Sequence, residues 1–290
     1  IKMATTESDD NSSNEWSQLA QTYQDLFVPR LQPLYDTMAH YAVKKIQSND
    51  TKGEYQLLDY GTGPGEPILT ILQQLTTNHL YNVKLQATDS SRGMLSLAEE
   101  RLRKLKNPYL TVNFSITHDS SNTNDYDIIT TSLVLPYASN QGQMLRDFFQ
   151  QLKPNGLLIS SHWPHPEQVP FLAIIKRIIK FMVTGERIDT SDLESNVSFC
   201  CWPEEITRRI FVTEGYTIEQ WITVDLPMPF PDIRTLLSLA RPFKWFRDSS
   251  LYLEAEEETK RILREDFHLE LQSNESFELP SKAVVVVASK

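Results

Sequence analysis

The feature that most constrains the fold is an alternation of short apolar runs with helical segments. The runs read as strands, and the segments between them carry apolar residues at helical spacing. Such alternation predicts a mainly parallel sheet with helices on both faces. The predicted strands are 54–60, 82–89, 110–119, 126–135 and 157–163.

The rest of the chain extends this α/β core. Helices are predicted across residues 14–50, before the first strand, and residues 1–13 are polar, acidic and expected to be disordered. Two more strands, 216–226 and 279–290, follow a long helical insertion. With no internal repeat or low-complexity linker, we expect one domain: a helical lid (14–50), a ligand-binding core (55–163) and cap insertions (164–212 and 227–265).

Glycine is concentrated in "LLDYGTGPGEP". The chain has nine glycines, and three of them are Gly61, Gly63 and Gly65, between the first strand and the next helix. In a parallel sheet this is the edge where ligands bind. The spacing is G-x-G-x-G, not the G-x-G-x-x-G of dinucleotide sites, and Glu66 would face a pyrophosphate. With Asp59 close by, the loop suits a cationic ligand, such as a sulfonium that also carries an amino group.

The segment from Asp59 to Gly65 resembles the first motif of class I S-adenosylmethionine-dependent methyltransferases. "DSSRGML", from Asp89, resembles the family's pattern after the second strand, and "LKPNGLLIS" resembles its turn into the fifth. The resemblance covers residues 14–163 and, more loosely, the C-terminal third. It implies a Rossmann-like, seven-stranded, mostly parallel sheet with a final antiparallel pair, an N-terminal helical lid and a helical cap after the fifth strand.

The same resemblance implies how the donor is held. Asp89 would take both ribose hydroxyls, Met94 would lie against the adenine, and Asp119 would accept from the adenine amino group. From the residues alone, Asp59 and Asp89 could be helix caps and Asp119 a turn residue. The expected binding set is Asp59, Gly61, Thr62, Gly63, Asp89, Ser90, Met94, Asp119 and Ser120.

Three branches of the family are disfavoured. After the fourth strand there is no Pro-Pro-aromatic motif of base methyltransferases, no glutamate pair of arginine methyltransferases and no acidic metal-ligand set. What remains resembles the small-molecule branch, which methylates quinone precursors, aconitate-like acids or natural-product scaffolds. The helix "EWSQLAQTYQDLF" matches the lid of that branch.

Candidate catalytic residues are Tyr23 and His162. The resemblance places Tyr23 near the donor methyl, although it could be a packing residue. His162 ends the fifth strand, where it could deprotonate an acceptor or be a structural histidine. With His165 it lacks a third metal ligand, so no metal site is expected. An acceptor pocket of Tyr137, Trp163 and Trp202 is predicted, while Phe171, Phe199 and Phe230 could line it or belong to the core.

The net charge, the lengths of the apolar runs and the cysteines limit which partners and which cell compartment are expected. The net charge of −10 argues against a dedicated nucleic-acid binder, no apolar run is long enough for a membrane span, and the adjacent Cys200 and Cys201 suit a reducing, cytoplasmic setting. We expect a small-molecule acceptor. A protein or RNA methyltransferase and a non-catalytic cofactor-binding or docking module stay open. The basic run 101–106 reads as a solvated helix face, with RNA contact as the alternative.

Overall fold

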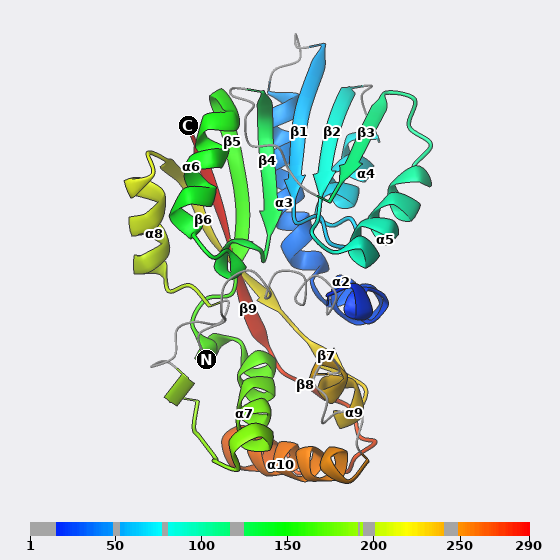
Figure 1. Cartoon of the computed structure of the whole chain (residues 1–290), viewed down its shortest axis with the longest axis vertical. Helices are drawn as coiled ribbons and strands as arrows, with labels where there is room; N and C mark the ends of the chain where they lie inside the picture. The colour runs from blue at the N-terminus through cyan, green and yellow to red at the C-terminus, as the bar shows by residue number, and fades with distance from the viewer. Residues whose placement is uncertain are drawn as a thin grey trace.

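The computed structural model describes residues 16–48, 53–76, 81–116, 125–190, 192–193, 201–240 and 249–290. Within these ranges the predicted seven-stranded sheet is confirmed (Figure 1). The first five strands run parallel to their neighbours, and β9 pairs antiparallel with both β5 and β6. The strand order is β3 (Leu110–Ser115), β2 (Asn82–Thr88), β1 (Glu54–Tyr60), β4 (Tyr126–Ser132), β5 (Leu152–His162), β9 (Ser281–Ser289) and β6 (Thr217–Leu226).

One predicted turn lies inside a strand. The sequence predicts a turn at "PNG", and the structure places these residues within β5, where the register with β4 shifts between Tyr126 and Ile128. Asn155 there has a positive φ of 64°. The turn is therefore an irregularity that interrupts the pairing without ending the strand.

Helices cover both faces of the sheet. Buried side chains of α3 (Gln32–Gln47), α4 (Ile68–Thr76) and α5 (Arg92–Arg103) form one cluster with the sheet. Those of α6 (Gln141–Gln151) and α8 (Glu204–Thr213) form a second cluster with the opposite face. Because successive strand residues point to opposite faces, neighbours in a strand belong to different clusters.

A smaller lobe lies below the sheet in Figure 1. The strands β6 and β9 lead into it, and the two-residue strands β7 (Pro229–Phe230) and β8 (Phe277–Glu278) pair there. Its described helices are α7 (Pro170–Thr184), α9 (Ile233–Leu237) and α10 (Ser249–Phe267), with the 3-10 turns η3 (Pro166–Gln168) and η5 (Ser238–Ala240). Buried residues of α7, α9 and α10 belong to the same cluster as α3 and α4, so the two lobes share one core.

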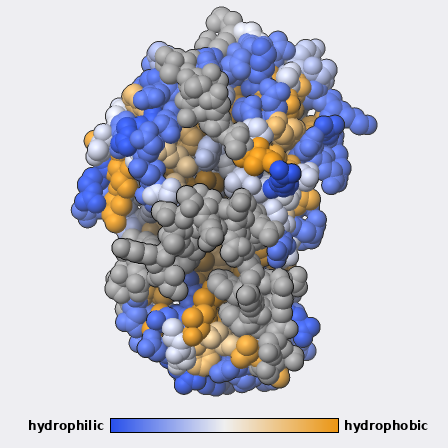
Figure 2. Space-filling view, viewed as in Figure 1, coloured by the Kyte–Doolittle hydropathy of each residue, from blue (hydrophilic) through white to orange (hydrophobic). Residues whose placement is uncertain are grey.

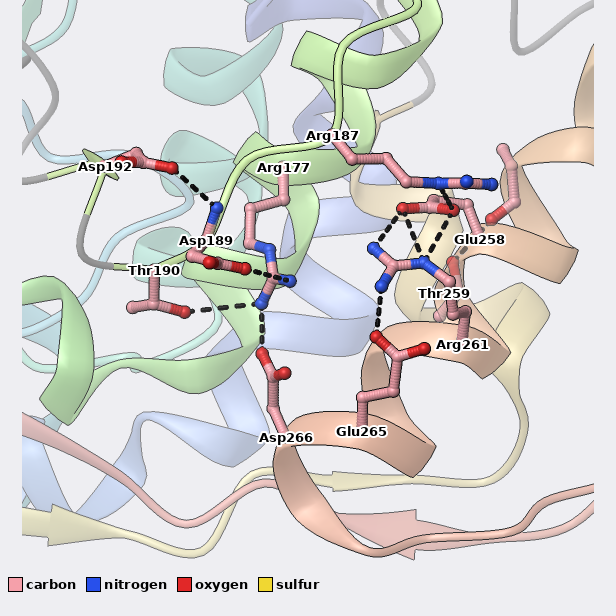
Figure 3. A network of polar contacts seen from close by, with 11 residues as sticks. Arg177, Arg187, Asp189, Thr190, Asp192, Glu258, Thr259, Arg261, Glu265 and Asp266 are labelled. Atoms are coloured by element: carbon pink, nitrogen blue, oxygen red, sulfur yellow. Dashed lines mark hydrogen bonds and ion pairs between the residues drawn. The ribbon is translucent and has the colours of Figure 1, made fainter.

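Ion pairs tie the helices of this lobe together (Figure 3). Arg177 of α7 is 3% exposed and donates to Asp266 of α10 and to Thr190. Glu258 of α10 accepts from Arg187 at 3.0 Å and from Arg261 of the next turn. Since a buried guanidinium is costly without a carboxylate partner, these contacts fix α7 against α10.

The N-terminal lid is helical but irregular. Residues 16–22 form an α-helix, which passes into a π-helical turn, η1 (Tyr23–Phe27), and then into α2 (Val28–Arg30) and α3. The amide of Val28 donates to the carbonyl of Tyr23, five residues back. The expected interruptions, Pro29 and Pro33, are accommodated in the first turns of α2 and α3, where a missing N–H costs nothing.

The lid rests on the first turn of α5. Ser91 is the N-cap of α5 and accepts from the amide of Met94, while its hydroxyl lies 2.9 Å from that of Ser17. The amide of Gly93 donates to the same Ser17 hydroxyl at 3.2 Å. A Cβ on Gly93 would lie 2.7 Å from the Ser17 carbonyl oxygen. Only glycine therefore lets the lid backbone approach this closely.

The surface is mainly polar. Figure 2 shows hydrophilic residues over much of the outer rim of both lobes, in keeping with the net charge of −10. No helix in the described parts of the chain is both long and apolar enough to cross a membrane.

Gly93→Ala should lift the lid from α5, because the backbone of Ser17 cannot yield to a Cβ without moving. Hydrogen exchange measured by mass spectrometry should become several-fold faster in residues 16–22 and stay unchanged in β1. Ser96→Ala, on the exposed side of α5, is the matched control. Unchanged hydrogen exchange of residues 16–22 in Gly93→Ala would show that the contact of Ser17 with Gly93 does not hold the lid on α5.

Candidate functional site

The three glycines of the loop after β1 differ in what surrounds them. All three have positive φ values, 69° at Gly61, 53° at Gly63 and 103° at Gly65. A Cβ on Gly61 would lie 2.4 Å from the Val134 side chain, and one on Gly65 would lie 2.9 Å from Leu69. On Gly63 a Cβ would meet no atom within 4 Å. The lack of a Cβ at Gly61 and Gly65 thus permits close packing, whereas the space beside Gly63 is open.

Asp59 holds the loop to the sheet. It is fully buried, and its two carboxylate oxygens accept from the hydroxyls of Thr62, at 2.5 Å, and Thr130 of β4, at 2.6 Å. Burial raises the pKa of Asp59 to about 7, against these two hydrogen bonds. Thr62 also donates its amide to the carbonyl of Thr88. Asp59 and Thr62 hold the loop to the sheet, and their expected contact with the donor stays a prediction.

Asp89 lies where the loop is open. It follows β2, and its carboxylate accepts from the amide of Gly63 at 2.8 Å and from that of Ser91 at 2.8 Å. Burial raises the pKa of Asp89, while the two amides lower it. The structure thus brings Asp89 and Gly63 together, as predicted. Ser90 is exposed beside them, and Met94 is buried on α5.

Two predicted donor residues cannot be placed. Asp119 and Ser120, expected at the end of the third strand, lie outside the described residues, and so does Phe199. Their assignments stay predictions.

Tyr23 of the lid lies close enough to Asp89 to be affected by its charge. Burial raises its pKa to about 12; a hydrogen bond from Tyr35 opposes the rise, and the charge of Asp89 adds to it. The phenol is therefore protonated at neutral pH and can orient a ligand, but it cannot accept a proton from an acceptor.

Aromatic rings continue from Tyr23 in both directions, and we call this set the aromatic series. Tyr23 stacks on Phe27, with ring centroids 5.0 Å apart, and meets Trp16 edge-on at 6.2 Å. The series spans the lid, the exit of β4 at η2 (Leu135–Tyr137), the end of β5, α7 and β7. Its remaining contacts are Trp16–Tyr137, Phe27–Phe171, Phe171–Trp163 and Phe171–Phe230, with centroids 5.4–6.5 Å apart.

His162 and Trp202 need a correction. His162 is 1% exposed, packs between the indoles of Trp202 and Trp221, and has its Nε2 atom 3.4 Å from the Thr207 hydroxyl. Burial lowers the pKa of His162 to about 3. Trp202 and Trp221, the two ring neighbours of His162, belong to the cluster on the α6 and α8 face, whereas Trp163 belongs to the other. The prediction of His162 as a base and Trp202 as pocket lining is therefore wrong on geometry.

A separate cavity of about 350 Å³ lies beside α7 and α10. None of its lining residues belongs to the glycine loop or to the aromatic series, so we do not assign the acceptor to it. The lining residues are Pro166, Glu167, Pro170, Ala173, Asp189, Thr190, Asp266 and Phe267.

A buried, neutral His162 predicts a definite pH dependence of stability. The pKa of His162 is lower in the folded than in the unfolded chain. Its contribution to the free energy of unfolding is therefore complete above pH 6.5 and is lost as pH falls towards 3. One such group costs at most about 1.4 kcal/mol of unfolding free energy per pH unit. His162→Phe should flatten this slope in denaturant titrations, whereas His40→Gln, at an exposed histidine, should not. An equal slope in all three proteins would refute the neutral, buried state.

Comparison with known proteins agrees with this geometry. Residues 58–158 match the family model described as a methyltransferase domain. The chain is 33% identical over 132 residues to a highly reducing polyketide synthase of Alternaria alternata, and 29% over 122 residues to a non-reducing polyketide synthase of Penicillium rubens. These matches cover 43% and 42% of this chain but only 4% and 5% of the two synthases.

The fold is also that of solved methyltransferases. A structure from Bacillus halodurans, named as a methyltransferase, matches with a TM-score of 0.56 and 13% identity, over 85% of this chain and 97% of that one. The family match lies on the strands and the loop that carry Gly63 and Asp89. Over residues 58–158 the chain therefore matches a methyltransferase domain, and its fold is shared with solved methyltransferases.

Proposed function

We propose that this protein methylates a small, largely apolar organic acceptor held between the lid and the cap segments 164–212 and 227–265. The observation that carries the proposal is the aromatic series. It begins at Tyr23, beside Asp89, and reaches Phe171 and Phe230 in the smaller lobe. Aromatic side chains that converge on one site favour an apolar ligand of limited size.

Asp89 and Gly63 fit the donor. A carboxylate can accept from two vicinal hydroxyls at once, and Asp89 offers one beside the open side of the loop. The carboxylates of Asp59 and Asp89 favour a cation over an anion here. When bound, S-adenosylmethionine supplies a methyl group already activated on a sulfonium centre.

Neither of the two candidate catalytic residues is suited to accept a proton from the acceptor. Tyr23 stays protonated, and His162 is buried between Trp202 and Trp221, which belong to the cluster on the other face of the sheet. We therefore propose that the chain acts by aligning the acceptor and excluding water, with the lid closing one side. An acceptor that reacts as an anion would have to lose its proton readily in solution.

Polyketide-type compounds are the acceptors to screen first. The matched relatives from Alternaria alternata and Penicillium rubens are named polyketide synthases. The net charge of −10 disfavours the RNA alternative. Turnover of a small acceptor would exclude the non-catalytic alternative directly.

Asp89→Ala should weaken S-adenosylmethionine binding by about 1.5–3 kcal/mol, because charge-assisted hydrogen bonds to the donor are lost. Isothermal titration calorimetry measures this, with Asp225→Ala, at an exposed acid of β6, as the control. If both variants bind the donor like the parent protein, Asp89 does not hold the ribose.

Tyr137→Ala should raise KM for an apolar acceptor several-fold and leave donor affinity unchanged, because Tyr137 ends the aromatic series. Its side chain is 51% exposed, so the substitution leaves no core cavity. Tyr109→Ala, at a tyrosine that is 38% exposed beside β3, is the control. Equal KM values for the two variants would remove Tyr137 from the acceptor site.

A further inference from the structure

Two arginines of α5 lie two residues apart and differ in what they contact. Arg103 pairs with Glu99 on its own helix, and its side chain is 74% exposed. Arg101 is 25% exposed and leaves the helix: its Nη1 donates to the carbonyl of Pro64 at 2.7 Å, and its Nη2 to Glu66 at 2.8 Å. The prediction that residues 101–106 form a solvated helix face is therefore confirmed for Arg103 and wrong for Arg101.

Glu66 links Arg101 to the start of α4. Its second oxygen accepts from the amide of Thr70 at 3.2 Å and from the Thr70 hydroxyl at 2.8 Å. The residue is 7% exposed, and burial raises its pKa, while Thr70 and the charge of Arg101 lower it. Arg101 thus compensates a buried carboxylate at the point where the glycine loop becomes a helix.

Three consecutive loop residues are each held by a side chain from a different place. Asp59 of β1 accepts from the hydroxyl of Thr62, Asp89 after β2 accepts from the amide of Gly63, and Arg101 of α5 donates to the carbonyl of Pro64. The carboxylates of the first two anchors are candidate residues that the sequence already indicates at strand ends. The third comes from a residue 37 positions away along the chain.

We propose that Arg101 is a positioning residue for the methyl donor: by fixing Pro64 and Glu66 it holds the loop in the shape that keeps the space beside Gly63 open. The inference rests on the binding of S-adenosylmethionine and is independent of the acceptor. Preorganisation of this kind acts on donor affinity, because a loose loop must be ordered when the ligand binds.

The same pair reaches towards the lid. Burial raises the pKa of Tyr35 well above its usual range; the charge of Glu66 adds to the rise, and that of Arg101 opposes it. Tyr35 is in turn the hydrogen-bond partner of Tyr23. Arg101 and Glu66 therefore lie at the junction between the loop, α4 and the lid.

Arg101→Gln and Arg103→Gln form the test, because the two remove the same charge from the same helix. Calorimetry with S-adenosylmethionine, at a temperature where both variants are folded, should show Kd raised about tenfold for Arg101→Gln and changed less than twofold for Arg103→Gln. Hydrogen exchange without the donor should become faster in residues 61–67 only in Arg101→Gln. Arg101→Lys, which keeps the charge and one donor group, should give an intermediate Kd.

The possible results distinguish failure of the inference about Arg101 from failure of the proposed function. Equal Kd for Arg101→Gln and the parent protein, even with a lowered melting temperature, would make Arg101 a stabilising residue only and overturn the inference. Equal weakening in both Gln variants would assign the effect to general charge and also overturn it. If Arg101→Gln does not fold, the Kd of Arg101→Lys decides in the same way. Failure of the parent protein to bind the donor would instead count against the proposed function.

Discussion

The site depends on a buried carboxyl group that joins three parts of the chain. Asp59 ends β1, accepts from Thr130 on β4, and accepts from Thr62 in the glycine loop. With a folded pKa of about 7, above its unfolded value of 3.8, Asp59 stabilises the fold fully at low pH and loses this contribution as pH rises through neutrality. A cationic donor bound as proposed would favour the ionised form and so link donor binding to the charge of Asp59.

Two segments near Asp59 are each held in place by side-chain contacts. The loop is held from the sheet by Asp59 and Asp89, and the lid is held on α5 by Ser17 against Gly93. Both α5 contacts, Ser17 with Gly93 at the start of the helix and Arg101 with Pro64 near its end, lie close to the glycine loop and Asp89. The aromatic series then connects the lid to the smaller lobe, whose helices are fixed by the Arg177 and Glu258 ion pairs.

What the sequence could predict was local. The succession of strands, the loop glycines and the place of Asp89 follow from patterns within about ten residues, and these agree with the structure. Two strand bounds were wrong, because β4 ends at Ser132 and β5 begins at Leu152. The contact of Arg101 with Pro64 crosses 37 residues and carries no sequence signature. His162 and Trp163 show a different limit: adjacent strand residues face opposite sides, and the sequence does not say which side holds the site.

The π-helical turn η1 has a consequence for how the lid can vary. A π turn places one more residue in a turn than an α-helix does, and each residue of a helix advances its face by about 100°. Trp16 and Ser17 lie before η1, while the anchored helix α3 lies after it. Loss of one residue from Tyr23–Phe27 would therefore turn η1 into an ordinary α-helical turn and leave Ser17 facing Gly93. The lid can thus differ by one residue in length at this turn without losing its contact with α5.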